Sequence, residues 1–180
     1  MAIKNRIPFS IAVALTAIFF LPLTMFLGKF NIPLWVSFIV WAEYFTFGAK
    51  LKAAGALVLP SFPAGSVICG LGWILSFAIV PLIPAAGGLW AYWIGFGIFV
   101  AILVKLMDWV PVFQKGSLAY FNGMTMTIAV LFTHSYPALS DNPLMQPVLA
   151  SVWTIIAGLF GLFLGWFNMA ITFPKEVADK

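Results

Sequence analysis

The sequence predicts an all-α membrane protein, a polytopic bundle of about six transmembrane helices that forms one domain over residues 1–180. Apolar residues make up 63% of the chain and charged residues only 8%, against roughly 25% charged residues in an ordinary soluble domain. So few charges cannot cover a water-soluble surface. The apolar residues also fall into six stretches, which short segments containing charge, proline or glycine separate.

The first two predicted spans cover residues 7–27 and 34–48. The chain starts like a secretory signal, with basic residues before an apolar run. That run has about the 20 residues that a spanning helix needs, and no small-x-small cleavage site follows it. We therefore predict a retained first helix, which a short turn at 28–33 connects to the second span.

The third predicted span, residues 53–80, is longer than a hydrocarbon core of about 30 Å requires at 1.5 Å per residue. Pro60 and Pro63 each remove a backbone donor, so we expect the helix to be broken or kinked there. A half-helix that restarts near Pro63 would present free N–H groups to a polar solute. The alternative is a simple kink whose freed carbonyls are satisfied by Ser61 and Ser66.

The last three spans are predicted at residues 89–104, 117–133 and 148–173. An uncharged linker at 81–88 precedes the first of them. The segment 134–147 contains three prolines and is the longest polar connection. It is expected to form an exposed loop.

The positions of the basic residues predict the orientation, because short cytoplasmic loops retain Lys and Arg. In a six-span arrangement only Lys29 falls on the outer side, and five or seven spans would scatter the basic residues over both sides. The other eight are Lys4, Arg6, Lys50, Lys52, Lys105, Lys115, Lys175 and Lys180. Both termini are thus expected in the cytoplasm. Since the bases do not cluster, the net charge of +4 indicates a lipid bilayer as partner and no nucleic acid.

Glu43 is the strongest candidate for a functional residue, because it is the one acid well inside a predicted span. A charge at a helix centre costs about 2.5–3.5 kcal/mol on insertion scales, and such residues usually face a bundle interior or a watery cavity. By helix rise, Glu43 and Pro60 both lie about 10–12 Å from the same cytoplasmic turn. The alternative is a structural glutamate that fixes helix packing.

Other side chains could line a polar pathway with this carboxyl. Asn122, Thr125 and Thr127 lie near the same predicted depth, and Trp41 and Tyr44 could narrow the pathway. The threonines could equally form interhelical hydrogen bonds, typically worth about 0.6–2 kcal/mol, and aromatic residues this common often serve packing. The full candidate set is Glu43, Ser61, Ser66, Asn122, Thr125, Tyr44 and Trp41.

Catalysis and cofactor binding have little support in the sequence. One histidine, one cysteine and one buried acid cannot assemble a zinc or di-iron site, and neither a Ser-His-Asp set nor a phosphate-binding glycine loop is present. We expect no enzymatic activity, no metal and no cofactor. His134, at the outer end of the fifth span, could act as a pH sensor or be an ordinary interfacial histidine.

Glycine stripes and paired aromatic residues indicate how the spans pack. Small residues let membrane helices approach closely, which predicts tight packing or a homo-oligomer; the stripes are Gly65, Gly70 and Gly72 on the third span and Gly158, Gly161 and Gly165 on the sixth. The pairs Tyr44-Phe45 and Tyr120-Phe121 each occur in the middle helix of a three-span half. They suggest a duplicated three-plus-three arrangement with halves of opposite orientation.

The order of these features is similar to a known family. The residues that carry the similarity are Trp35, Phe38, Trp41, Tyr44, Phe45 and Gly48, a glycine-containing third helix, Phe121-x-Gly123 and a glycine-rich last helix. Over residues 34–166 the chain resembles the YcdZ-like small bacterial inner-membrane proteins, a family of unknown function. The resemblance implies a bacterial inner-membrane location, and Glu43 stands outside the pattern of that family.

These observations favour a channel or facilitator for a small, mostly neutral polar solute such as urea, an amide or an amine. Two alternatives remain open. One is a non-transporting membrane subunit that packs against partner membrane proteins. The other is a proton-coupled transporter that uses Glu43.

Overall fold

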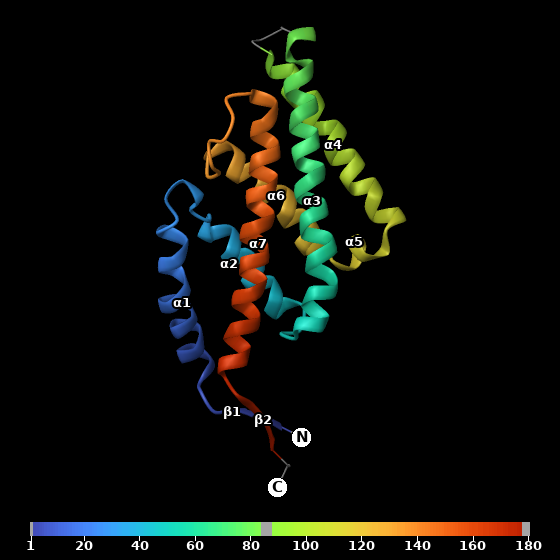
Figure 1. The fold of residues 1–180 in the computed structure, drawn as a ribbon. Helices are drawn as coiled ribbons and strands as arrows, with labels where there is room; N and C mark the ends of the chain where they lie inside the picture. The colour runs from blue at the N-terminus through green and yellow to red at the C-terminus, as the bar shows by residue number, and fades with distance from the viewer. Residues whose placement is uncertain (1, 84–87, 178–180) are drawn as a thin grey trace.

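The computed structural model describes residues 2–83 and 88–177 and is an all-α bundle with one helix in each of the six predicted segments (Figure 1). The helices are α1 (Phe9–Met25), α2 (Leu34–Thr46), α3 (Leu51–Ile79), α4 (Leu89–Trp109), α5 (Pro111–Lys115), α6 (Ser117–Phe132) and α7 (Gln146–Ile171). Short α5 was not predicted. Lys180 and the middle of the linker predicted at 81–88 lie outside the described residues.

The two ends of the chain meet in a small antiparallel ribbon that the sequence analysis did not predict. Strand β1 (Ala2–Asn5) pairs with β2 (Pro174–Val177). Next to the ribbon, the backbone N–H groups of Arg6 and Ile7 both donate to the carbonyl oxygen of Thr172, at 3.0 and 3.3 Å. The ribbon thus places the starts and ends of the chain together at one end of the bundle (Figure 1).

The helices differ in length in a way that matters for the site. Three helical segments are long and apolar enough to cross a membrane, namely Leu51–Leu82, Leu89–Trp109 and Pro143–Ile171. Helices α1 and α6 are apolar but shorter. Helix α2 has 13 residues, or about 20 Å at 1.5 Å per residue. Both α2 and α6 pack against α3 and α7, so the short helices lie between the long ones.

Helix α3 continues without interruption through both of its prolines. Of the two outcomes predicted at the prolines, the break is absent, and no half-helix begins near Pro63 to offer free N–H groups; the kink stays a prediction. Each proline removes one backbone hydrogen bond, but α3 packs against α4, α6 and α7, and this packing holds the helix together. Ser61 and Ser66, the suggested partners of the freed carbonyls, bond to other helices instead.

The contacts between helices follow the expected three-plus-three arrangement. The halves are α1–α2–α3 and α4–α6–α7, and the third helix of each half packs most extensively against the second helix of the other. The first helix of each half likewise packs against the third helix of the other half. Because α3 and α7 run in opposite directions (Figure 1), the pattern supports two inverted halves.

Glycines allow α3 to approach α6 closely, and α7 to approach α2. A Cβ atom at Gly65 of α3 would overlap the backbone carbonyl of Tyr120 in α6, and a Cβ at Gly161 of α7 would overlap that of Ser37 in α2. The same kind of contact thus occurs in both helix pairs. Small residues at such positions are what lets two membrane helices pack backbone to backbone.

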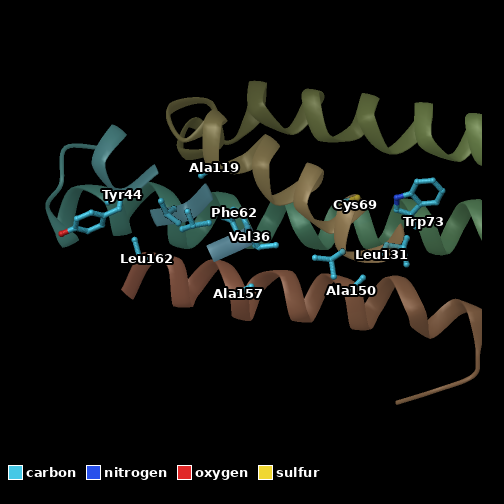
Figure 2. Close-up of a cluster of buried hydrophobic side chains, with 14 of the residues drawn as sticks. Val36, Tyr44, Phe62, Cys69, Trp73, Ala119, Leu131, Ala150, Ala157 and Leu162 are labelled. Carbon is cyan, nitrogen blue, oxygen red and sulfur yellow. The ribbon is translucent and has the colours of Figure 1, made fainter. Parts of the chain in front are cut away.

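Buried apolar side chains fill the space along the whole length of α3 and α7 (Figure 2). Val36, Phe62 and Ala157 lie near the middle of this core, and Trp73 lies at the end opposite Tyr44. Large apolar side chains also cover the outer surface, for example Phe19, which is 65% exposed. The bundle is therefore apolar both inside and outside.

The close approach of α3 and α6 predicts that Gly65→Ala destabilises the protein. The added methyl group forces the two backbones apart, and such overpacking typically costs about 1–3 kcal/mol. We expect a lower thermal unfolding midpoint for the variant in detergent. Gly97→Ala is the matched control, because a Cβ at Gly97 meets no atom within 4 Å. Equal midpoints for the two variants would contradict the contact.

Candidate functional site

Glu43 and Asn122 form a hydrogen-bonded pair across the interface between the two halves. Glu43 lies three residues before the end of α2, and Asn122 lies in the second turn of α6. The Asn122 Nδ2 donates to Glu43 Oε1 at 2.6 Å, although the residues are 79 positions apart in sequence. Glu43 is only 2% exposed. The two sequence candidates thus occupy one enclosed site.

The carboxyl of Glu43 is only half satisfied by this contact. Its second oxygen, Oε2, is buried and has no hydrogen-bond partner among the described residues. Buried polar atoms in native proteins are nearly always bonded to protein or to ordered water. The free oxygen is therefore available to an N–H or O–H donor of a bound solute, or to a proton.

Further buried polar groups without a partner lie near the same end of the bundle. Asn168, three residues before the end of α7, is fully buried, and both polar atoms of its amide are unbonded within residues 2–83 and 88–177. The hydroxyl of Tyr120 and the indole N–H of Trp41 are also buried without a hydrogen-bond partner among the described residues. The sequence analysis missed Asn168, although a lone amide in an apolar span was an available signal.

The predicted site residue Ser66 belongs to a different polar cluster. Its hydroxyl lies 2.5 Å from the hydroxyl of Thr127 and donates to the carbonyl oxygen of Ser151 at 3.2 Å. The Ser151 hydroxyl donates back to the Ser66 carbonyl at 3.1 Å. These bonds join α3, α6 and α7 and leave the hydroxyls satisfied. Thr127 is five residues beyond Asn122, about 8 Å along α6 by helix rise.

Two more candidates lie away from the pair. The Ser61 hydroxyl donates to the carbonyl oxygen of Val112 in α5 at 3.2 Å, which ties α3 to that helix. Thr125 is exposed, and its hydroxyl bonds to the Phe121 carbonyl of its own helix. Thr125 lies three residues after Asn122, on the same side of α6, but this bond occupies its hydroxyl. The structure therefore does not place Thr125 in the site.

The aromatic candidates flank Glu43 in sequence but serve packing. Tyr44 is buried with its ring against Gly165 of α7, and it meets the Phe45 ring edge-on at 5.6 Å. Figure 2 shows Tyr44 at one end of the core with its hydroxyl pointing away from the cluster. Trp41 is buried as well, with its ring centroid 6.1 Å from that of Phe38.

The cavities of the bundle lie away from the Glu43–Asn122 pair. None of the five cavities that we describe within residues 2–83 and 88–177 is lined by Glu43 or Asn122. An apolar one of about 400 Å³ lies between α3, α4 and α6 and is lined mostly by aromatic rings, Trp73 and Phe96 among them. The carboxyl of Glu43 is thus buried, while Asn122 is partly exposed.

Metal binding has no visible candidate in the described parts of the chain. They hold no group of three or more His, Cys, Asp or Glu side chains that could bind an ion. Cys69, the single cysteine, is buried in the apolar core. The expectation that the protein has no metal, no cofactor and no catalytic residues stays a prediction.

Comparison with known proteins gives a family but no activity. A family model with the description "Protein of unknown function (DUF1097)" matches residues 10–172. No curated protein and no solved structure matches the chain. The match supports the expected membership of an uncharacterised family, and it does not test the resemblance to YcdZ-like proteins in particular.

The geometry of the pair predicts that Asn122→Ala destabilises the protein more than a neighbouring surface change does. The substitution leaves the buried carboxyl of Glu43 without its one described partner, and an orphaned buried polar group costs about 1–3 kcal/mol. Thermal or denaturant unfolding in detergent measures the loss. Thr125→Ala on the exposed face of α6 is the control. Equal stability of the two variants would show that the Asn122–Glu43 bond contributes nothing.

Proposed function

Because the chain belongs to the DUF1097 family of proteins of unknown function, we propose a function from the geometry: an integral membrane protein that passes a small, mostly neutral polar solute between its two halves. The observation that carries this proposal is the Glu43–Asn122 pair, a half-satisfied carboxyl enclosed where the halves meet. Transporters built from inverted repeats have their substrate sites at such interfaces.

The surface and the charges support a membrane location. Soluble monomers rarely expose large contiguous apolar areas, whereas exposed Ile, Leu, Phe and Trp side chains occur on most helices of this bundle. The α2–α3 turn, which holds Lys50 and Lys52, lies toward the end of the bundle where both termini meet (Figure 1). By the retention of basic residues in the cytoplasm, this end is cytoplasmic in a multi-pass bacterial inner-membrane protein.

The chemistry of the pair suits a solute that both donates and accepts hydrogen bonds. Glu43 Oε2 can accept one bond, while the Asn122 amide has a second N–H donor and a carbonyl oxygen besides the N–H that it donates to Glu43. Urea and short amides carry adjacent N–H donors and a carbonyl acceptor. A solute of this class can therefore bond to both partners at once.

The burial of Glu43 favours alternating exposure over an open pore. Three residues separate Glu43 from the end of α2, which is about 5 Å of helix on the cytoplasmic side. On the outer side, a longer part of α2 lies between Glu43 and the helix start at Leu34. A small movement of one half against the other would therefore open the pair to the cytoplasm first.

A non-transporting subunit is the second candidate, because apolar grooves run along the outside of the bundle. One lies between α3 and α7 and is lined by residues such as Val67, Leu71 and Val152. A second groove is formed by leucines of the same two helices with Phe163 and Trp166. Grooves of this kind could seat a helix of a partner or of a second copy.

Liposomes that contain the purified protein should take up urea or acetamide faster than empty liposomes. Glu43→Gln should lose most of this uptake, because the carboxamide has an NH2 group in place of one of the two carboxyl oxygens. Thr125→Ala should keep the uptake. Light scattering records the swelling. If neither the wild type nor either variant moves any solute while all are folded, the subunit role is favoured. Uptake only under a pH gradient would indicate proton coupling through Glu43.

The orientation gives a separate prediction. A fluorescent reporter that folds only in the cytoplasm should be bright when it is fused after the C-terminus. The same reporter should be dark when it is inserted in the loop after α6. A bright loop insertion with a dark C-terminal fusion would reverse the proposed topology, whatever the solute.

A further inference from the structure

A polar cavity of about 240 Å³ lies where α2 begins and α6 ends. Its walls include Lys29, Asn31 and Pro33, which directly precede α2, and His134, Ser135 and Tyr136, which follow α6. At about 30 Å³ for each water molecule, the cavity has room for a solute of several non-hydrogen atoms. The turn at 28–33 that forms one wall lies at the end of α1 away from the β1–β2 ribbon (Figure 1).

The wall that precedes α2 is fixed by hydrogen bonds to other helices. The backbone carbonyl of Asn31 accepts a bond from the indole N–H of Trp153 in α7 at 2.8 Å. The Asn31 side-chain oxygen accepts from the backbone N–H of Leu27 at 2.9 Å. Ile32 donates its N–H to the carbonyl of Thr24 in α1 at 3.2 Å. This side of the cavity is therefore preformed.

The wall that follows α6 is fixed in a similar way. The backbone N–H groups of His134 and Ser135 donate to the carbonyls of Leu131 and Val130 at the end of α6. His134 has a φ of 51°, a left-handed conformation that costs a non-glycine residue of order 1 kcal/mol and is concentrated at functional sites. The His134 Nδ1 lies 3.3 Å from the Tyr136 hydroxyl. Burial raises the pKa of Tyr136, so its hydroxyl stays neutral.

The cavity and the Glu43–Asn122 pair lie at opposite ends of the same two helices. Nine residues separate Leu34, the start of α2, from Glu43, which is about 14 Å by helix rise. The buried side chains of Val36 and Val40 in α2 and of Val130 in α6 lie between the two levels. The buried hydroxyls of Ser37 and Thr127 lie in the same stretch and are hydrogen-bonded. Packed side chains over about two helical turns thus separate the cavity from the pair.

We propose that this cavity is the outer binding site at which the solute enters the interface between α2 and α6. The inference rests on the proposed function and adds the place where a small neutral solute with hydrogen-bond donors and acceptors binds first. The Ser135 and Tyr136 hydroxyls supply groups that both donate and accept. Lys29 adds a donor and disfavours cationic solutes.

Labelling of single cysteines tests the site without relying on transport. Cys69 is buried and is the single native cysteine, so Cys69→Ala gives a background without thiols. Ser135→Cys places a thiol in the cavity wall. Ala138→Cys, in the same loop, is exposed and does not line the cavity. Both should react with a membrane-impermeant maleimide added to the outside of intact cells.

Acetamide and acetate are matched probes of nearly equal shape that differ in charge. Acetamide at high concentration should slow the labelling of Ser135→Cys at least about threefold and leave that of Ala138→Cys unchanged. Protection by acetate alone would make the cavity an anion site, for a carboxylate or a lipid phosphate, and would overturn the proposal. If Ser135→Cys stays unlabelled while Ala138→Cys reacts, the cavity is not open to the outer solution.

The uptake assay separates this inference from the proposed function. If the liposomes take up acetamide but acetamide protects neither cysteine, the outer site is wrong and the transport function stands. Protection without any uptake overturns the transport function and the role of the cavity as an entrance. In a transporting protein, Tyr136→Phe should raise the KM for uptake about threefold to tenfold, the range of one neutral hydrogen bond, with the maximal rate unchanged. Tyr92→Phe, in the apolar cavity, is the control.

Discussion

The structure depends on the backbone-to-backbone approach of α3 with α6 and of α7 with α2. When lipid surrounds a bundle, burying apolar side chains between helices gains little, because the lipid tails are equally apolar. Close packing and interhelical hydrogen bonds then have to supply the stability. Gly65 and Gly161 allow this packing by leaving room for the carbonyls of Tyr120 and Ser37. These two helix pairs also join the two halves, since each pair contains one helix from each half.

This packing has a direct consequence for the polar groups. It buries α2 and α6, the short helices, and with them a carboxyl that would otherwise reach water. The hydroxyls of Ser66, Thr127 and Ser151 are satisfied by one another and by carbonyls, as expected for groups that only hold helices together. Glu43 keeps an oxygen without a described partner. That contrast distinguishes the site from the structural polar cluster.

Hydropathy and charge were sufficient to locate the helices, because the cost of burying charge and the length of a helix are properties of each segment. They failed where neighbours decide the outcome. The prolines of α3 did not break the helix, since three packed helices support it on several sides. The β1–β2 ribbon joins residues at opposite ends of the chain, and such pairing leaves no local pattern to detect. Asn122 reaches the carboxyl of Glu43 across the helix interface, whereas the hydroxyl of Thr125 bonds to a carbonyl of its own helix.

The sequence alone determined that the chain is helical and apolar, which six segments form the main helices, and that Glu43 is the buried acid. These properties follow from the composition and spacing of neighbouring residues. Only the tertiary structure decided that Asn122 is the partner of Glu43, that Ser66 belongs to a separate cluster, and that Asn168 is buried without a described partner. The physical reason is that a hydrogen bond between helices depends on how each helix is rotated and shifted against the next. Contacts between the whole surfaces of both helices set that rotation, and local preferences along either helix do not.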